Sequence, residues 1–137
     1  MDVKNKRVVV TGAASGIGKA LCEAFHQAGA QSIVAVDMNI EGAKETADSV
    51  NGIAIQANVG KEEDIINVIE KANEHAGGID IFCSNAGIGG VPGFFEVEAS
   101  DWKNIWDVNV QSHIFAAKHL LPQMIERGEG YLVNTSS

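Results

Sequence analysis

The stretch Thr11-Gly12-Ala13-Ala14-Ser15-Gly16-Ile17-Gly18 joins a short apolar run, Arg7–Val10, to a segment with helical periodicity, Gly16–Ala28. A strand, a glycine-rich turn and a helix in this order leave unpaired backbone N–H groups at the helix N-terminus. These groups and the helix dipole favour an anion, and glycine allows close approach because it has no Cβ. The stretch therefore predicts a turn that binds a pyrophosphate, with contacts from Gly12, Ser15, Gly16, Ile17 and Gly18.

An acidic residue at the end of a second apolar run indicates which kind of anionic ligand to expect. Asp37 directly follows Ser32–Val36. In a strand–helix–strand unit, an acid at this place hydrogen-bonds the adenosine ribose of a dinucleotide, and its charge repels a 2′-phosphate. No Arg or Lys stands at Ser15, Met38 or Asn39 to bind such a phosphate. We therefore expect the cofactor to be NAD (NADH) rather than NADP.

A phosphate-binding loop of the Walker A type is a competing interpretation of this turn. Ala13 and the pair Gly18-Lys19 come close to that motif, but Ala20 stands where a Ser or Thr hydroxyl would hold magnesium. A tight turn that binds nothing is a second alternative for a glycine loop taken alone. The strand, the helix and the acid in register favour the dinucleotide interpretation.

The composition is that of an ordinary globular chain, and its charge excludes some partners. The chain has 137 residues, of which 45% are hydrophobic and 20% charged, and a formal net charge of −8. This charge disfavours nucleic acid and anionic membranes as partners. No apolar run approaches the ~18 residues of a membrane span, and residues 1–6 lack the apolar core of a signal peptide. We expect a single cytoplasmic dinucleotide-binding domain over residues 1–137.

The two cysteines predict a packing role in a reducing compartment. Cys22 falls on the apolar face of a predicted helix, and Cys83 falls in a predicted strand. Cys22 and His26 stand four residues apart and would form half of a metal site. No second Cys/His pair in the sequence completes it, so we expect no metal.

Strand and helix patterns alternate along the chain. Apolar runs predict strands at 7–11, 32–37, 53–57, 79–84 and 131–135. Helical periodicity and turn signals predict helices at about 16–28, 41–50, 62–76, 100–105 and 108–127. The buried stripe of the first helix is expected to be Ile17, Leu21, Ala24, Phe25 and Ala28. That of the last helix is expected to be Val110, Ile114, Ala117, Leu121 and Met124.

This alternation predicts an α/β fold with a parallel sheet and helices on both faces. The expected topology is the Rossmann-type, doubly wound order 3-2-1-4-5, which places a ligand crevice between the first and fourth strands. Residues 85–95 contain four glycines and a proline, so they predict a loop at the carboxyl end of the fourth strand.

Four motifs in the right order resemble the short-chain dehydrogenase/reductase family, in its subgroup with a T-G-x-x-x-G-I-G loop. Thr11–Gly18 resembles the cofactor loop, and Asn85-Ala86-Gly87 resembles the family's N-A-G element. Asn109 looks like its structural and catalytic asparagine, and residues 133–137 look like the strand that leads into the catalytic serine, Ser137. The resemblance covers the whole chain and implies hydride transfer between NAD and a small alcohol or carbonyl substrate.

The resemblance also implies roles for residues around the adenine. Asn85, Ala86 and Gly87 would brace the sheet and line the adenine side of the cofactor. Asn58 precedes Val59 where the family commonly has Asp, which accepts from the adenine amino group; the Asn side-chain oxygen can also accept. Taken by position alone, Asn109 could equally satisfy a buried backbone group, and Asn85 could be only a turn residue.

The chain lacks one part of the family's catalytic set. The family uses a Tyr-x-x-x-Lys pair, in which the tyrosine transfers a proton and the lysine lowers the tyrosine pKa. Tyr131, the one tyrosine, lies in the predicted fifth strand and is followed four residues later by Thr135. We therefore expect the chain as given to be inactive. We also expect it to be the N-terminal part of a longer, homo-oligomeric enzyme, incomplete at its C-terminus and without the family's last strands.

A non-catalytic module is the alternative hypothesis. In that case the 137 residues would be complete, and they would bind a dinucleotide, or a partner through the bare edge of the fifth strand. A bare apolar edge strand at 131–135 invites pairing or aggregation, and this favours the longer enzyme.

Overall fold

Five parallel strands form one sheet in the order β3-β2-β1-β4-β5. The computed structural model describes residues 2–90, 93 and 95–136. The strands are β1 (Arg7–Thr11), β2 (Ser32–Asp37), β3 (Ile53–Gln56), β4 (Ile81–Ser84) and β5 (Tyr131–Asn134). The order confirms the predicted doubly wound topology, with β1 and β4 adjacent at its centre.

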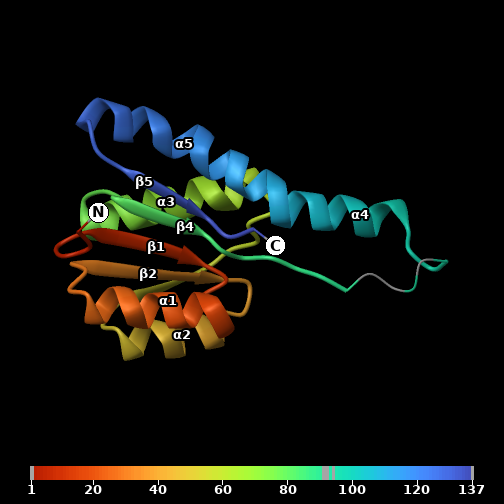
Figure 1. Ribbon diagram of the computed structural model, residues 1–137, viewed down its shortest axis with the longest axis horizontal. Coiled ribbons are helices and arrows are strands. Elements are labelled where there is room, and N and C mark those ends of the chain that lie inside the picture. The colour runs from red at the N-terminus through yellow and green to blue at the C-terminus, as the bar shows by residue number, and fades with distance from the viewer. Residues whose placement is uncertain (1, 91–92, 94, 137) are drawn as a thin grey trace.

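Helices cover both faces of the sheet (Figure 1). On one face lie α1 (Gly16–Gln27) and α2 (Ile40–Ser49), and on the other lie α3 (Glu62–Ala76) and α5 (Ser112–Arg127). Successive side chains of a strand point to opposite faces, so Val8 and Val10 pack with Leu21 of α1, whereas Val9 packs with Leu120 of α5. Two apolar cores therefore hold β1 between them.

The predicted buried stripe of α1 is partly wrong, since Leu21 and Phe25 are only partly buried against the core. Gly18 and Cys22 are its buried residues, whereas Ile17 is 66% exposed. A Cβ at Gly18 would lie 2.0 Å from the carbonyl oxygen of Gly12. Because glycine and cysteine are small, α1 packs closely on the turn, and its larger apolar side chains are partly buried or exposed.

The last two predicted helices form one continuous helical rod. The segment α4 (Ala99–Trp106) runs into a π-helix, η1 (Asp107–Gln111), which runs into α5. A π turn contains an extra residue and rotates the following helix about its axis. The predicted stripe from Val110 to Leu121 is wrong, and only Met124 belongs to the buried face. That face consists of Ser112, Ala116, Leu120 and Met124.

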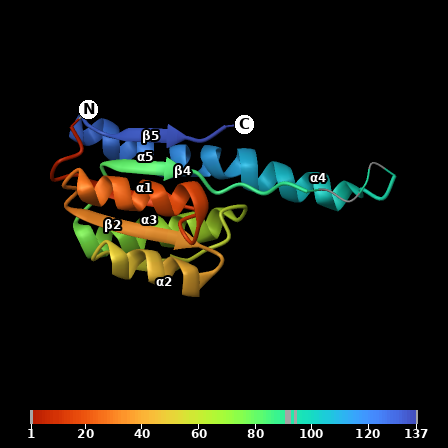
Figure 2. The same ribbon diagram turned by 60° about the horizontal axis from the view of Figure 1, so that its bottom comes forward.

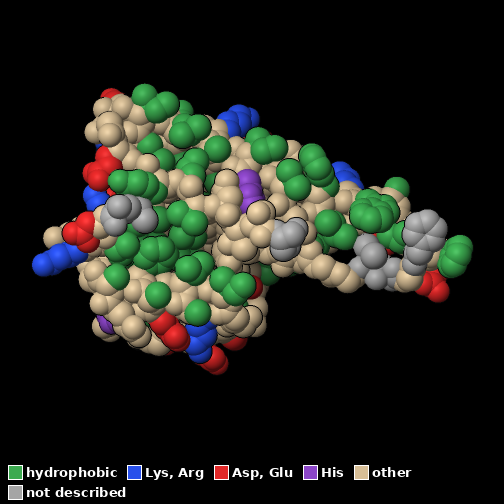
Figure 3. Space-filling model, in the orientation of Figure 1, with side chains coloured by type: hydrophobic (Ala, Val, Ile, Leu, Met, Phe, Trp, Pro, Cys, Tyr) green, Lys and Arg blue, Asp and Glu red, His purple; other side chains and the backbone are tan. Residues whose placement is uncertain are grey.

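The segment α4 projects from the body of the molecule, as Figures 1 and 2 both show. None of its residues is buried, and Trp102 and Trp106 are 57% and 55% exposed. Figure 3 shows hydrophobic side chains along this projection and over the part of the molecule that carries β5. Within the described residues, no helix has the length and apolar character needed to cross a membrane.

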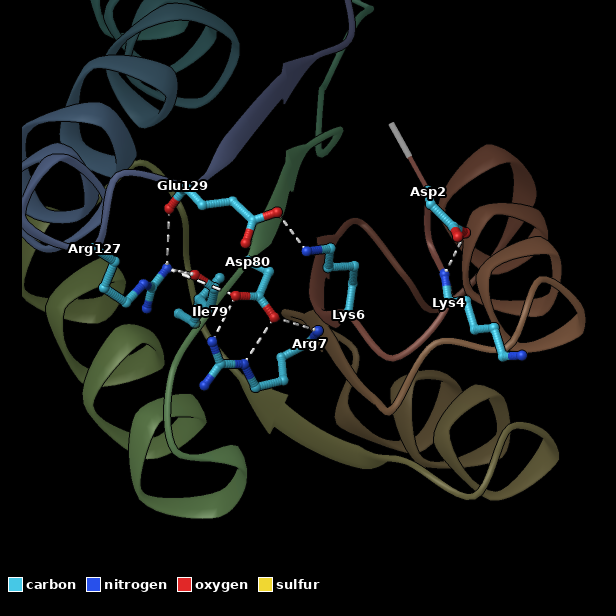
Figure 4. Close-up of polar contacts among 8 residues, drawn as sticks. All are labelled: Asp2, Lys4, Lys6, Arg7, Ile79, Asp80, Arg127 and Glu129. Atoms are coloured by element: carbon cyan, nitrogen blue, oxygen red, sulfur yellow. Dashed lines mark hydrogen bonds and ion pairs between the residues drawn. The ribbon is translucent and has the colours of Figure 1, made fainter.

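A cluster of charged side chains joins the strands at the amino end of the sheet (Figure 4). Arg7 donates from Nε to Oδ2 of Asp80 at 2.8 Å, and its backbone N–H donates to the same oxygen at 2.9 Å. Arg127, at the end of α5, donates to the carbonyl oxygen of Ile79 at 2.5 Å. Hydrogen bonds from Arg7 lower the pKa of Asp80 to about 2. We call this the amino-end cluster; its members are Lys6, Arg7, Asp80, Arg127 and Glu129.

Candidate functional site

The glycine turn lies at the carboxyl end of β1, between β1 and α1. Gly12 and Gly16 have φ angles of +69° and +53°, a conformation that other residues rarely adopt. A Cβ at Gly12 would also lie 2.9 Å from the Cα of Ala86. Ser15 caps α1 without a side-chain hydrogen bond, and the first turn of α1 holds no acidic residue. The first N–H groups of α1 are therefore open to an anionic ligand.

Asp37 at the end of β2 is fixed beside this turn. Its Oδ2 accepts the backbone N–H of Ala14 at 3.0 Å, and its Oδ1 accepts that of Asn39 at 2.9 Å. Each carboxylate oxygen can accept further hydrogen bonds, so Asp37 can still receive hydroxyl donors. The two backbone contacts orient the carboxylate before any ligand arrives.

A pocket of about 280 Å³ opens at the same end of the sheet. It brings together six of the residues predicted for cofactor binding: Gly12, Asp37, Asn58, Val59, Ala86 and Gly87. The rest of the lining consists of Met38, Ala57, Ile88 and Val108, none of which the sequence predicted as a binding residue. The other predicted residues of the glycine stretch lie outside this lining, at the N-cap and in the first turn of α1: Ser15, Gly16, Ile17 and Gly18. A strip of apolar side chains with one carboxylate suits a flat ring system carrying a polar sugar.

Asn85 connects strands rather than lining the pocket. Its Nδ2 donates to the carbonyl oxygen of Thr11 at 3.0 Å, and its Oδ1 accepts from Oγ1 of Thr135 at 3.1 Å. Both ends of the amide are thus engaged, one to the end of β1 and one to the residue after β5. This arrangement places Asn85 as a brace across the carboxyl end of the sheet.

Thr11 is a site residue that sequence reasoning missed. Its buried Oγ1 donates to the carbonyl oxygen of Cys83 at 3.2 Å and accepts the N–H groups of Asn85 and Ala86 at 2.9 and 3.0 Å. One hydroxyl therefore sets the path of the chain as it leaves β4 and enters the pocket wall. Its position as the last residue of a strand before a glycine turn was the available signal.

Asn109 lies in η1 and holds the loop after β4. Its Oδ1 accepts the N–H of Ile88 at 2.8 Å, and its Nδ2 donates to the carbonyl oxygen of the same residue at 2.8 Å. The side chain thus pairs with one backbone unit through both of its polar atoms. Ser137, the residue predicted to be the catalytic serine, lies outside the described residues.

Other reactive side chains are placed away from this site or are held in an unreactive form. Burial raises the pKa of both Cys22 and Cys83 to about 12, so the thiols stay protonated at neutral pH. Tyr131 is the first residue of β5 and lies at the amino end of the sheet, opposite the glycine turn. It is therefore not positioned to transfer a proton at the pocket.

The sequence of this chain is similar to those of curated oxidoreductases. The chain is 36% identical to an uncharacterized oxidoreductase, YvrD, of Bacillus subtilis, in a match covering 100% of this chain and 53% of YvrD. It is 34% identical to glucose 1-dehydrogenase 2 of the same organism, over 99% of this chain and 55% of that protein. The chain thus spans about half the length of these curated relatives.

A solved structure shares the fold closely. The crystal structure of a short-chain type dehydrogenase/reductase from Mycobacterium marinum matches with a TM-score of 0.91 and 27% identity. The match covers 99% of this chain and 57% of that one. The short chain dehydrogenase profile matches residues 6–137, which include the glycine turn, the pocket and Asn109. The chain therefore belongs to the short-chain dehydrogenase family of oxidoreductases.

Proposed function

We propose that this chain forms the cofactor-binding part of an NAD-dependent oxidoreductase that transfers hydride between the nicotinamide and a hydroxyl or carbonyl substrate. The observation that carries the proposal is the placement of Asp37 beside an open helix N-terminus and an apolar pocket. The residues present fit a dinucleotide: N–H groups for the pyrophosphate, a carboxylate for the ribose and a slot for the base.

Asp37 supports NAD over NADP. Its carboxylate has lone pairs left for the two ribose hydroxyls, and its charge opposes a 2′-phosphate at the same place. The next residue is Met38, which is 62% exposed and carries no charge that would offset the repulsion. This arrangement favours a cofactor with a free 2′-hydroxyl.

The residues around the pocket would position the bound cofactor without reacting themselves. The backbone of the glycine turn would hold the pyrophosphate, and Thr11 and Asn85 would keep β1, β4 and β5 in register beneath it. Asn109 would hold the loop after β4 through Ile88. When bound, the nicotinamide supplies or accepts the hydride.

Proton transfer to the substrate requires a group that the described residues do not place at the pocket. We propose that it comes from a longer protein of which this chain is the N-terminal part, and that the chain alone is inactive. The share of its relatives that the chain spans, 53% and 55%, supports this. So does the outer strand β5, where Tyr131 and Val133 are 38% and 39% exposed.

The remaining partner proposals follow from charge and exposed surface. The net charge of −8 supports a small-molecule substrate rather than nucleic acid or an anionic membrane, and we propose a cytoplasmic location. The exposed apolar residues Ile114, Leu121 and Ile125 on α5 support a homo-oligomer of the longer protein. An intact-mass measurement on the protein from its source cell tests whether the chain is part of a longer protein. Size-exclusion chromatography of that protein tests whether it is a homo-oligomer.

The cofactor proposal is tested by binding rather than by turnover. We expect NADH to bind the purified protein more tightly than NADPH, as measured by the change in NADH fluorescence. Asp37→Ala combined with Met38→Arg should lower the NADH:NADPH affinity ratio by at least about tenfold, since it removes the repulsion and adds a cation. Glu41→Ala, which removes an exposed carboxylate from the first turn of α2, is the control for charge alone. An unchanged ratio in the double variant would mean that Asp37 does not contact the ribose.

A further inference from the structure

The helix α2 contacts the glycine turn through two residues, Gly42 and Thr46, which lie one helical turn apart. The hydroxyl of Thr46 donates to the carbonyl oxygen of Ala13 at 2.8 Å, and both residues are 0% exposed. A Cβ on Gly42 would lie 2.8 Å from the Cβ of Ala14. Residues four apart share one face of a helix, so this face of α2 lies against the middle of the turn.

The hydroxyl of Thr46 bonds outside its own helix. A threonine inside a helix can bond to the carbonyl oxygen four residues earlier, which for Thr46 is that of Gly42. Its hydroxyl reaches Ala13 instead, which is 33 residues away in the sequence. Thr46 therefore links two separate elements.

The peptide unit between Ala13 and Ala14 is held at both ends. Its carbonyl oxygen accepts from Thr46, and its N–H, which belongs to Ala14, donates to Oδ2 of Asp37 at 3.0 Å. A peptide unit is planar, so hydrogen bonds at its two ends limit its rotation. The N–H of Ala13 also donates to the carbonyl oxygen of Val36 at 3.1 Å, which fixes the preceding unit. The chain is thus directed into α1 by contacts with β2 and α2.

The N–H groups that follow this unit are those that the proposed function assigns to the pyrophosphate, and the inference below rests on that function. They belong to Ser15, which caps α1 without a side-chain hydrogen bond, and to the first residues of α1. A Cβ at Gly16 would meet nothing within 4 Å, so this part of the turn faces open space. Rotation of the held unit would move these groups, because they follow it directly in the chain. A site already fixed in its binding geometry loses less entropy when the ligand arrives.

We propose that Thr46 is a positioning residue for the pyrophosphate of the cofactor. It acts without contacting the ligand, because its side chain is buried and engaged with Ala13. Through the carbonyl oxygen of Ala13 it sets the direction of the N–H groups at the start of α1. Gly42 contributes by leaving the space that the side chain of Ala14 occupies.

Two probes that differ only in the pyrophosphate test this proposal. ADP and adenosine share the base and the ribose, so the ratio of their dissociation constants reports what the two phosphates add to binding. NMR titration of the purified protein measures both constants, and we expect the wild type to bind ADP more tightly than adenosine. Thr46→Val keeps the shape of the side chain and removes the donor. It should lower the advantage of ADP at least about fivefold and leave the affinity for adenosine within about twofold of the wild type.

Two further variants separate positioning from a general loss of stability. Thr46→Ser keeps the hydroxyl and should restore the ratio to within about twofold of the wild type. Val50→Ala removes two methyl groups from a buried residue at the other end of α2. It should lower the free energy of unfolding in urea and leave the ratio unchanged. A ratio that falls as far in Val50→Ala as in Thr46→Val would mean that any loosening of α2 weakens the site, and it would overturn the proposal.

Gly42→Ala tests the same face of α2 and serves if Thr46→Val fails to fold. Alanine suits a helix better than glycine, but its methyl group would lie 2.8 Å from the Cβ of Ala14 and displace the turn. We expect the advantage of ADP over adenosine to fall at least about threefold. An unchanged advantage would contradict the role of this face in positioning the turn.

The outcomes separate this inference from the proposed function. If the wild type binds ADP no more tightly than adenosine, or binds neither, the proposed function fails and this inference fails with it. If ADP is favoured and the ratio in Thr46→Val stays within about twofold of the wild type, the proposed function stands and the role of Thr46 is wrong. Equal losses of ADP and adenosine affinity in Thr46→Val would also overturn it, since Thr46 would then support the whole site and not the pyrophosphate.

Discussion

Thr11 shows how one side chain can define the wall of a binding site. Its hydroxyl uses one donor and two acceptor positions, all on backbone groups of Cys83, Asn85 and Ala86. The residue is 2% exposed, so water cannot replace these contacts. The segment from Cys83 to Ala86 leaves β4 at the pocket, and its path therefore depends on a residue of β1.

Replacing Thr11 by valine tests this role. Valine has the same shape and suits a strand, but it leaves two partly buried N–H groups, those of Asn85 and Ala86, without an acceptor. We expect Thr11→Val to lower the free energy of unfolding by about 2 kcal/mol and to weaken NADH binding. Urea denaturation and NADH titration measure the two effects. Thr11→Ser keeps the hydroxyl and should cost less than half as much, and equal losses in the two variants would contradict the role of the hydroxyl.

At the scale of elements, the π-helix η1 is what the sequence pattern could not predict. The strands and most helices begin and end within a few residues of their predicted bounds, because apolar periodicity and glycines specify them locally. Apolar residues occur on more than one face of α5, so their spacing did not show that Ile114 and Leu121 are exposed. The π turn has no such sequence pattern either. It places Asn109 where its side chain reaches Ile88.

The element-scale prediction concerns this contact between η1 and the loop after β4. Asn109→Leu removes both hydrogen bonds to Ile88, so the backbone there should open more often. We expect amide exchange at Ile88 to become at least about fivefold faster, with a loss of about 1 kcal/mol in unfolding free energy. Hydrogen exchange followed by NMR measures the exchange rate of the Ile88 amide. Asn104→Leu on the exposed α4 is the control, and equal protection of Ile88 in wild type and Asn109→Leu would refute the contact.

For the molecule as a whole, the strand order could be predicted, but the contacts that hold the sheet together could not. Alternating strands and helices with a glycine turn restrict the possible topologies, because the crossover connection between two parallel strands is almost always right-handed. The amino-end cluster, in contrast, joins Arg7 to Asp80, which are 73 residues apart, and no spacing in the sequence pairs them. The same holds for Asn85 and Thr135, 50 residues apart. Such contacts can be predicted only once it is known which strands are adjacent.

The amino-end cluster predicts how stability depends on pH. Arg7 holds the pKa of Asp80 at about 2, below the ~3.9 of an unfolded aspartate. Since the folded pKa is the lower one, the contribution of Asp80 is complete above about pH 4 and is lost as the pH falls toward 2. The shift corresponds to about 2–3 kcal/mol at neutral pH.

Asp80→Asn should therefore destabilise the protein in a pH-dependent way. We expect its unfolding free energy at pH 7 to be lower than that of the wild type by about 2 kcal/mol, and the difference to shrink as the pH falls from about 4 toward 2. Urea denaturation at a series of pH values measures it. Asp48→Asn removes an exposed carboxylate that has no hydrogen-bond partner among the described residues, so its curve should follow the wild type. A deficit in Asp80→Asn that stays constant down to the lowest pH would mean that packing, and not the charge of Asp80, joins β1 to β4.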